Sequence, residues 1–177
     1  MRIGPVEKAR HILITGPPRC GKSTLIERIV RRLGRPATGF FTREIKEGGR
    51  RVGFAIDTLD GKRGILAHQG ARSQCRVGKY GVNIEDIDRI AVPSLVSSRA
   101  GDLVVVDEIG KMECFSRLFR ETLVRVLNSG RVVLGSIAFK GDRFIEEIKG
   151  RHDVSLIRLS GENRDEALEI VLAHLRH

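Results

Sequence analysis

The stretch "HILITGPPRCGKSTLIERIV", residues 11–30, decides the fold. It places a short apolar run before a turn rich in glycine and proline, and apolar residues at helical spacing after that turn. The turn fits the pattern G-x-x-x-x-G-K-[ST] with Gly16, Gly21, Lys22 and Ser23. Because the pattern lies between an expected strand and an expected helix, the sequence predicts a phosphate-binding loop here. The alternative is a chance match at an ordinary strand–turn–helix corner.

The residue types of this loop explain how it would hold a phosphate chain. Glycines allow main-chain N–H groups to converge on an anion, and the N-terminus of the following helix adds the positive end of a dipole. We expect Lys22 to reach the outer phosphates and the hydroxyl group of Ser23 to bind Mg²⁺. The other loop positions predicted to contact a nucleotide are Pro17, Pro18, Arg19 and Cys20.

A second motif, "LVVVDEIG" at residues 103–110, is typical of a buried strand that ends in acidic side chains, the Walker B pattern. Asp107 is expected to hold Mg²⁺ through water or Ser23, and Glu108 to orient or deprotonate an attacking water molecule. A helix cap is the alternative for this acidic pair. In open parallel sheets ligands bind at the carboxyl ends of strands, where both motifs lie. The predicted binding residues of this motif are Leu103, Val104, Val105, Val106, Asp107, Glu108, Ile109 and Gly110.

Strands and helices alternate from residue 102 onward, which predicts an α/β fold with a mostly parallel sheet flanked by helices on both faces. Asn163 is the expected N-cap of the last helix. The expected strands lie at 102–110, 131–139 and 154–160, and the expected helices at 115–130, 142–150 and 163–177.

The middle of the chain departs from this alternation. Residues 38–69 are expected to form an antiparallel β-meander inserted in the fold, with "KEGG" as a hairpin turn. A helix is expected near 84–98, interrupted by Pro93. The sequence shows no interdomain linker and no internal repeat, so residues 1–177 are expected to form one domain.

The composition narrows the classes of protein and partner. The chain has 177 residues, a net charge of +10, one tyrosine and no tryptophan. Its basic residues are scattered and few aromatic residues accompany them, so nucleic-acid binding is not favoured. No apolar run is long enough to span a membrane, and "MRIGPVEKAR" lacks the apolar core of a signal peptide. Both observations favour a soluble, cytoplasmic protein. The protein is also expected to be a monomer. The spacing of the cysteines argues against a disulfide framework or a zinc site; they are Cys20, Cys75 and Cys114.

Some residues outside the two motifs are further candidates. Ser136, near the end of the strand at 131–139, would either sense a γ-phosphate or pack as a small residue beside a helix. The polar loop "SGENRDEA", residues 160–167, would either border the base of a nucleotide or cap the last helix. The remaining candidates for nucleotide contact, each with solvation or a tight turn as its alternative, are Arg43, Arg51, Arg120, Lys79 and Tyr80.

Longer stretches of the sequence resemble one family. They are "GFFTREIKEGGRRVGFAIDTLDGKRGILA", "CRVGKYGVNIE", "VVVDEIGKMECFS" and "ENRD", together with the phosphate-binding loop. In this order they resemble the small thermophile-type nucleoside-triphosphatases related to the human cancer-related nucleoside-triphosphatase. The resemblance spans about residues 10–170.

The resemblance implies a P-loop NTPase fold and Mg²⁺-dependent hydrolysis of nucleoside triphosphates (ATP, GTP, CTP, UTP and TTP) to nucleoside diphosphate and phosphate, with low base selectivity. It implies a first binding motif at 16–23, a second at 103–110, and the catalytic carboxylate at Glu108, so that Lys22 and Glu108 are the expected catalytic pair. Many members have Gly-Val where this chain has "RC" at 19–20, a change that keeps the N–H donors. Members often have threonine in place of Ser136, and both keep a hydroxyl group.

Two other functions fit the same loop. A kinase would pass the phosphoryl group to a nucleoside, a nucleotide or another small acceptor, with residues 38–69 as a lid or acceptor site. A nucleotide-dependent switch or nucleic-acid-associated ATPase would turn over slowly until a partner is added. Product analysis with and without acceptors separates the kinase from the hydrolase.

Overall fold

The computed structural model describes residues 9–96 and 103–176, and the strands within them form one mixed sheet. Its strand order is β5-β6-β4-β3-β2-β7-β8-β1-β9. The strands from β2 to β9 in this order are parallel, and those from β2 outward to β5 are antiparallel. The strands are β1 (His11–Thr15), β2 (Ala37–Glu47), β3 (Arg50–Thr58), β4 (Arg63–His68), β5 (Arg76–Val77), β6 (Tyr80–Val82), β7 (Leu103–Ile109), β8 (Val132–Ile137) and β9 (Val154–Arg158).

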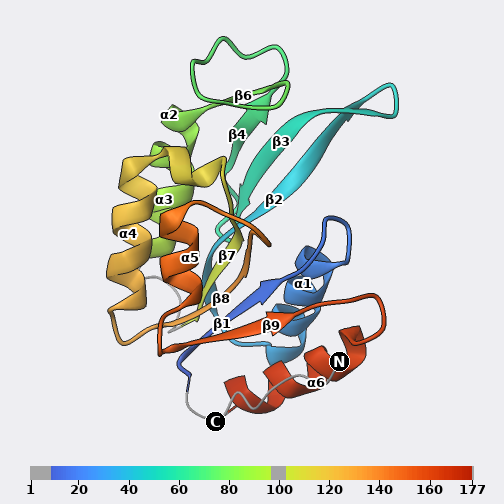
Figure 1. Cartoon of the computed structure of the whole chain (residues 1–177), viewed down its shortest axis with the longest axis vertical. Helices are drawn as coiled ribbons and strands as arrows, with labels where there is room; N and C mark the ends of the chain where they lie inside the picture. Colours follow the sequence, from blue (N-terminus) through green and yellow to red (C-terminus); the bar gives the residue numbers. More distant parts are fainter. Residues whose placement is uncertain (1–8, 97–102, 177) are drawn as a thin grey trace.

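Helices cover both faces of the parallel half. Figure 1 shows α1 and α6 together on one face and α3, α4 and α5 on the other. None of the helices in the described ranges is long and apolar enough to cross a membrane. The helices are α1 (Lys22–Leu33), α2 (Ile84–Asp86), α3 (Val92–Val96), α4 (Arg117–Leu127), α5 (Arg143–Lys149) and α6 (Arg164–Leu175), with a π-helix η1 (Ile87–Ala91) and a 3₁₀-helix η2 (Glu113–Phe115).

The continuous apolar run of β7 follows from this layered arrangement. Leu103 and Val105 pack against α1 and α6, whereas Val104 and Val106 face the cluster formed with α4 and α5. All four side chains are fully buried. A strand covered on both faces needs apolar residues at every position, so alternation is lost from its sequence.

The predicted α/β core is confirmed. The strand at 11–15 and the helix from Lys22 have the expected bounds, and Gly34 closes α1 in the left-handed conformation. The later strands and helices also appear in the expected order, shortened by a few residues at their ends. Residues 102 and 177, at the ends of two expected elements, lie outside the described ranges.

The predicted meander is confirmed as antiparallel, and it is part of the same sheet as the parallel strands. Gly48 and Gly49 form the β2–β3 turn with φ of 52° and 75°, values that glycine adopts readily. The first part of β2 also pairs in parallel with β7, from Ala37 opposite Leu103 to Phe41 opposite Asp107. The meander therefore continues the parallel sheet, and its hairpin projects beyond the helices (Figure 1).

The expected interruption at Pro93 is wrong. Residues 84–96 form one helical run in which α2 leads into η1 and then into α3. Pro93 lies just after the π-helix η1, where the wider turn already departs from the regular hydrogen-bond ladder that a proline would interrupt, so the helical run continues past it. Residues 97 and 98 of the expected helix lie outside the described ranges.

Candidate active site

The phosphate-binding loop connects β1 to α1 at the carboxyl edge of the sheet. Gly21 occupies the N-cap of α1 with φ of 96°, which favours glycine. A Cβ atom on Gly16 would lie 2.6 Å from the carbonyl oxygen of Leu159, so the loop approaches the segment after β9 too closely for a side chain. Arg19 has a left-handed backbone and an exposed side chain. Both glycines of the motif are thus required by the local geometry.

The ammonium group of Lys22 lies over this loop. Its Nζ donates hydrogen bonds to the carbonyl oxygens of Gly16 and Pro17, each over 3.2 Å. Cys20 is buried, and its carbonyl oxygen accepts a hydrogen bond of 2.9 Å from Nε of Arg164, at the start of α6. The conformation of the loop is therefore fixed by Lys22 at the start of α1 and by Arg164 near the other end of the chain.

The acidic motif lies two strands away, with β8 between β1 and β7. Asp107 is buried, and its Oδ1 accepts a hydrogen bond from the hydroxyl group of Ser136 on β8. Ser136 is fully buried and uses its hydroxyl group on this carboxylate. This hydrogen bond indicates a third role for Ser136, the positioning of Asp107, in addition to the two sequence interpretations.

The surroundings of Asp107 fit a magnesium ion. Its Oδ2 atom is buried and has no hydrogen-bond partner among the described residues. Burial raises the pKa of Asp107, whereas the hydroxyl groups of Ser136 and Ser23 and the charges of Arg43 and Lys22 lower it. A carboxylate oxygen and a serine hydroxyl group are hard ligands of the kind that Mg²⁺ prefers together with phosphate oxygens. The described residues contain no larger cluster of His, Cys, Asp and Glu suited to a metal.

Glu108 follows directly, at a cis peptide bond with Asp107, and remains partly accessible. Burial raises the pKa of its carboxyl group; the positive charge of Lys22 opposes this rise, and the negative charge of Asp107 adds to it. A carboxylate with a raised pKa is a stronger proton acceptor than an exposed one. Glu108 therefore has the chemistry of a general base beside Lys22.

Glu113 on η2 is a second carboxyl group at the same place. A Cβ atom on Gly110 would lie 2.9 Å from Oε1 of Glu108 and 2.9 Å from Oε2 of Glu113, so the two side chains flank this glycine. Burial raises the pKa of Glu113 well above its usual range, and the charges of Glu108 and Asp107 raise it further. Burial and the neighbouring carboxylates therefore favour the protonated form of Glu113.

A pocket of about 590 Å³ brings the two motifs together. Gly16, Pro18 and Lys22 line it from the loop, and Glu108 and Gly110 from the end of β7. Its other walls are mostly apolar or basic, with Thr42 and Glu113 as the exceptions. They come from the antiparallel half of the sheet, from β2 and from the segments after β7 and β8, and are Thr42, Phe54, Leu66, Val77, Lys111, Met112, Glu113, Ala138, Phe139 and Lys140.

Other residues of the predicted motifs support this pocket from the core. Leu103, Val104, Val105, Val106 and Ile109 are fully buried and do not line it. They hold β7 between the two layers of helices, which fixes where Asp107 and Glu108 emerge. The part of the second motif that faces the pocket is Glu108 and Gly110.

The candidate arginines lie in different environments. Arg43 pairs with Glu27 and with Asp57, at 3.8 Å from the latter, and its charge acts on Asp107. Arg120 binds Asp142 and the carbonyl oxygen of Cys114, away from the pocket lining. Arg43 is thus the one of these two that reaches the acidic motif electrostatically.

Arg51 belongs to a separate cluster with Tyr80. Its guanidinium group binds Glu44 over 2.8 Å and the hydroxyl oxygen of Tyr80 over 3.1 Å. Lys79 lies over the ring of Tyr80, 5.4 Å from its centroid. Neither Lys79 nor Tyr80 lines the pocket, and the turn at Gly78 between β5 and β6 agrees with the tight-turn interpretation.

The polar loop before α6 contacts the phosphate-binding loop through Arg164. Asn163 occupies the N-cap position as predicted, but its side chain does not cap the helix. Its carbonyl oxygen accepts from the N–H of Ser160 and its amide donates to the carbonyl oxygen of Arg158, which closes the loop on itself. The structure thus places this loop beside the phosphate-binding loop.

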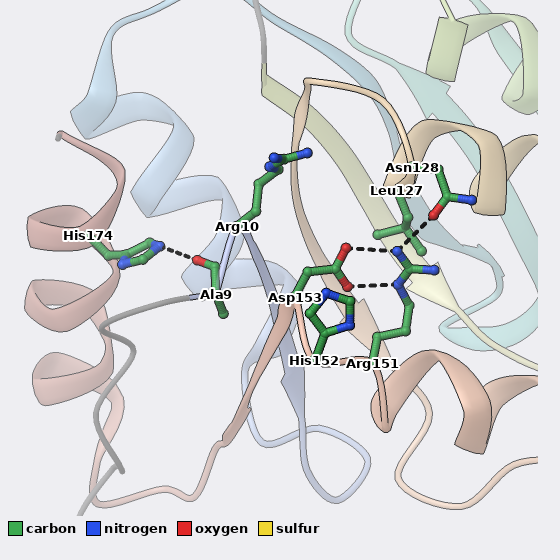
Figure 2. A pocket seen from close by; sticks show the side chains of 8 residues that line it. All are labelled: Ala9, Arg10, Leu127, Asn128, Arg151, His152, Asp153 and His174. Carbon is green, nitrogen blue, oxygen red and sulfur yellow. Dashed lines mark hydrogen bonds and ion pairs between the residues drawn. The ribbon is translucent and has the colours of Figure 1, made fainter.

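A second hollow, of about 610 Å³, lies at the opposite edge of the sheet, where β1 and β9 begin (Figure 2). Arg151 binds both carboxylate oxygens of Asp153, over 2.8 and 2.7 Å, and also the side chain of Asn128. His174 donates to the carbonyl oxygen of Ala9 over 2.7 Å. These groups join chain segments to one another, so we assign this hollow a structural role.

Sequence reasoning missed Glu113 and Arg164 as parts of the site. Glu113 lies in "DEIGKME", where four residues separate it from Glu108, and no periodicity marks it as buried. Arg164 stands in the "ENRD" stretch, whose contact with Cys20 spans 144 positions of sequence. A buried acid and a long-range contact leave no local pattern, although both residues lie inside stretches that carry the family resemblance.

Comparisons with known proteins agree with this geometry. A profile of the family described as NTPase matches residues 11–172. The nucleoside-triphosphatase THEP1 of Thermotoga maritima is 46% identical over 166 residues, which cover 93% of this chain and 95% of that protein. The human cancer-related nucleoside-triphosphatase is 40% identical over 177 residues, covering 90% and 93% of the two chains.

Two solved structures are similar over nearly their whole length. The crystal structure of THEP1 from the hyperthermophile Aquifex aeolicus has a TM-score of 0.84 at 37% identity, covering 94% of this chain and 99% of that one. The solution structure of a human cancer-related nucleoside triphosphatase has a TM-score of 0.81 at 36% identity, with coverage of 95% and 98%.

Proposed function

Because the chain belongs to the NTPase family, we propose that it is a nucleoside-triphosphatase that uses Mg²⁺ to release phosphate from nucleoside triphosphates with low base selectivity. The observation that carries this proposal is the placement of Lys22 and Glu108 in one pocket although 85 positions separate them in the sequence. A cation for the outer phosphates and a base for water are the two side chains that hydrolysis requires.

The loop and Lys22 bind the phosphate chain. Main-chain N–H groups at the start of α1 point toward the anion, and the helix dipole adds to their field. The Lys22 ammonium group exchanges its bonds to the carbonyl oxygens of Gly16 and Pro17 for phosphate oxygens. Ser23 and Asp107 would hold Mg²⁺, which neutralises charge on the β- and γ-phosphates.

Glu108 orients a water molecule against the γ-phosphorus and accepts its proton. Its raised pKa suits this role, because a base is most effective when its pKa approaches the working pH. The raised pKa of Glu113 beside it favours the protonated form of that group, which reduces the negative charge facing the phosphate. The bond from phosphorus to the bridging oxygen then breaks, and the nucleoside diphosphate leaves with the electron pair.

Low base selectivity agrees with the composition of the candidate base region. The guanine-reading motif N-K-x-D does not occur in the sequence. In the loop before α6, the side chain of Asn163 is engaged by Arg158 and Ser160. We therefore infer that contacts to the triphosphate supply most of the binding free energy, and the base little.

A steady-state panel tests this proposal. The common ribo- and deoxynucleoside triphosphates are incubated with and without Mg²⁺, and phosphate release is measured. We expect release from every nucleotide, dependence on the metal, and kcat/KM values within about tenfold of each other, since a base that makes few contacts contributes about 1.4 kcal/mol or less. Lys22→Ala should lower kcat/KM by about 10²- to 10³-fold. Wild-type hydrolysis in that variant would contradict the assignment of the phosphate-binding loop.

A further inference from the structure

The pocket at the active site is larger and more apolar than a triphosphate and a water molecule require. Its polar part, from Gly16, Lys22 and Glu108, accounts for the phosphates and the attacking group. Beyond Glu108 the walls are Phe54, Leu66, Val77 and Met112. A phosphate gains nothing from such walls, whereas sites for small organic molecules combine apolar walls with a few polar groups.

The position of the two motifs shows which end of the nucleotide faces this apolar part. The amide groups at the start of α1 bind the inner phosphates, and Lys22 reaches the outer ones. Glu108 marks the γ-phosphorus, because its role is to direct the attacking oxygen. In the sheet, β7 with Glu108 lies between β1, which leads into the loop, and the strands β3, β4 and β5, which carry the apolar walls. The apolar part therefore adjoins the γ-phosphate on the side away from the loop.

The apolar walls are held rigidly. The ring of Phe54 on β3 contacts the ring of Tyr80 edge to face at 5.3 Å, and the guanidinium group of Arg51 lies 5.0 Å from its centroid. Arg51 is fixed in turn by Glu44 and by the Tyr80 hydroxyl group. Leu66 is 2% exposed. A wall supported in this way keeps its shape when a ligand enters.

Two cations lie on the same pocket. Lys111 and Lys140 are exposed, and neither has an ion-pair or hydrogen-bond partner within the described ranges. Both belong to the segments that follow β7 and β8, beside the apolar walls. Their charges complement an anionic group on whatever occupies this part of the pocket.

We propose that the apolar part of this pocket binds a small alcohol with an aromatic or apolar body and an anionic group, and that the protein transfers the γ-phosphoryl group to it. This inference depends on the proposed function, since it uses the same nucleotide site. The alcohol oxygen attacks the γ-phosphorus, its proton passes to Glu108, and the bond to the bridging oxygen breaks. A phosphate monoester and a nucleoside diphosphate result, with water as the competing acceptor.

A probe with these three parts tests the proposal. 4-(Hydroxymethyl)benzoate carries a ring, a hydroxyl group and a carboxylate; 4-methylbenzoate lacks the hydroxyl group and benzyl alcohol lacks the charge. A ligand of this size binds in about the millimolar range, so each probe is used at about 10 mM with ATP and Mg²⁺. ³¹P NMR separates the phosphate monoester from inorganic phosphate, and ligand-observed NMR measures binding.

We expect the ester to account for about half or more of the phosphoryl groups released with the complete probe, because a bound hydroxyl group has a large effective concentration. With benzyl alcohol the ester fraction should be about tenfold lower, and 4-methylbenzoate should bind without accepting phosphate. Hydrolysis that continues with no ester and no binding of either benzoate would overturn the acceptor site alone. Failure to cleave ATP without any probe would overturn the proposed function itself.

Variants locate the site of transfer. Val77→Glu places a carboxylate in the apolar wall and should lower the ratio of ester to phosphate about tenfold, whereas Val77→Ile should keep it. Ile65→Glu makes the same chemical change at an exposed position on β4 outside the pocket, and it should keep the wild-type ratio. A ratio is independent of the amount of folded enzyme. Equal ratios in Val77→Glu and Ile65→Glu would overturn the assignment to this pocket.

Discussion

The two halves of the sheet contribute different chemistry to one pocket. The parallel half, from β2 to β9, supplies the loop and Glu108 to its lining, with Asp107 and Ser136 buried beside them at the carboxyl ends of β7 and β8. The antiparallel half supplies apolar side chains from β3, β4 and β5. The comparison shows that the residues for phosphate binding and the apolar walls of the pocket come from different halves of the sheet. A substitution in one half can therefore be made while the contribution of the other half is measured.

The largest effect is expected in the parallel half, from Glu108→Gln. The amide keeps the size of the side chain but cannot accept a proton, so kcat should fall by about 10³-fold. Binding of Mg²⁺–nucleotide, measured by calorimetry, should remain, because the phosphate contacts are unchanged. Glu47→Gln, at an exposed position at the end of β2 and outside the pocket, is the matched control. Unchanged turnover in Glu108→Gln would show that another group directs the water molecule.

A smaller effect is expected from Ser136→Ala, one strand away. The change removes the hydrogen bond to Oδ1 of Asp107, a bond of the kind that fixes metal-binding carboxylates. The Mg²⁺ concentration needed for half-maximal turnover should rise by about 10- to 100-fold, measured by metal titration at saturating nucleotide. Ser136→Thr keeps the hydroxyl group and should restore most of the affinity. A titration curve like that of the wild type in Ser136→Ala would contradict the positioning role.

Glu113→Gln concerns the pocket wall after β7, which lies between the two halves of the sheet. Its effect should be seen in the pH dependence of stability. The pKa of Glu113 is raised in the folded state, so the native protein holds a proton that the unfolded chain releases above its ordinary carboxyl pKa. Stability should therefore fall as the pH rises from about 4.5 toward neutrality. The glutamine variant carries no such proton, and its Tm should decline less over the same range. Parallel Tm curves for the two proteins would show that Glu113 is ionised in the native state.

The smallest effect is expected in the antiparallel half, from Tyr80→Phe. The change removes a hydrogen bond to Arg51 at 3.1 Å, which should lower the free energy of unfolding by about 0.5–1.5 kcal/mol, measured by denaturant titration. The kcat/KM for nucleotide hydrolysis should stay at the wild-type value, since Tyr80 does not line the pocket. A loss of hydrolysis together with a wild-type stability would contradict the separation between the two halves.

Much of the parallel half was predictable from sequence. Gly16, Gly21 and Lys22 stand at fixed spacing between a strand and a helix, and the acidic pair follows four apolar residues, so local patterns sufficed. The β2–β3 hairpin was marked by its glycines for the same reason. Such features depend on neighbouring residues alone.

The rest depended on contacts that no local pattern records. Phe54 reads as an ordinary strand residue and Val77 as part of a tight turn, and the pairing of β3, β4, β6 and β5 brings both to the pocket that Glu108 lines. The short strands β5 and β6 were missed because two or three residues carry too little periodicity. Pro93 was misread because the sequence does not show that a π-helical turn precedes it, so it looks like a proline that breaks a helix.

The place of β1 in the sheet has a consequence for synthesis on the ribosome. This strand is made first among the described strands, yet both its neighbours, β8 and β9, come from the last third of the chain. Until those segments have left the exit tunnel, the backbone of His11–Thr15 has no partners and the loop after it has no support. The nascent protein therefore acquires its affinity for nucleotide late, when translation is almost finished.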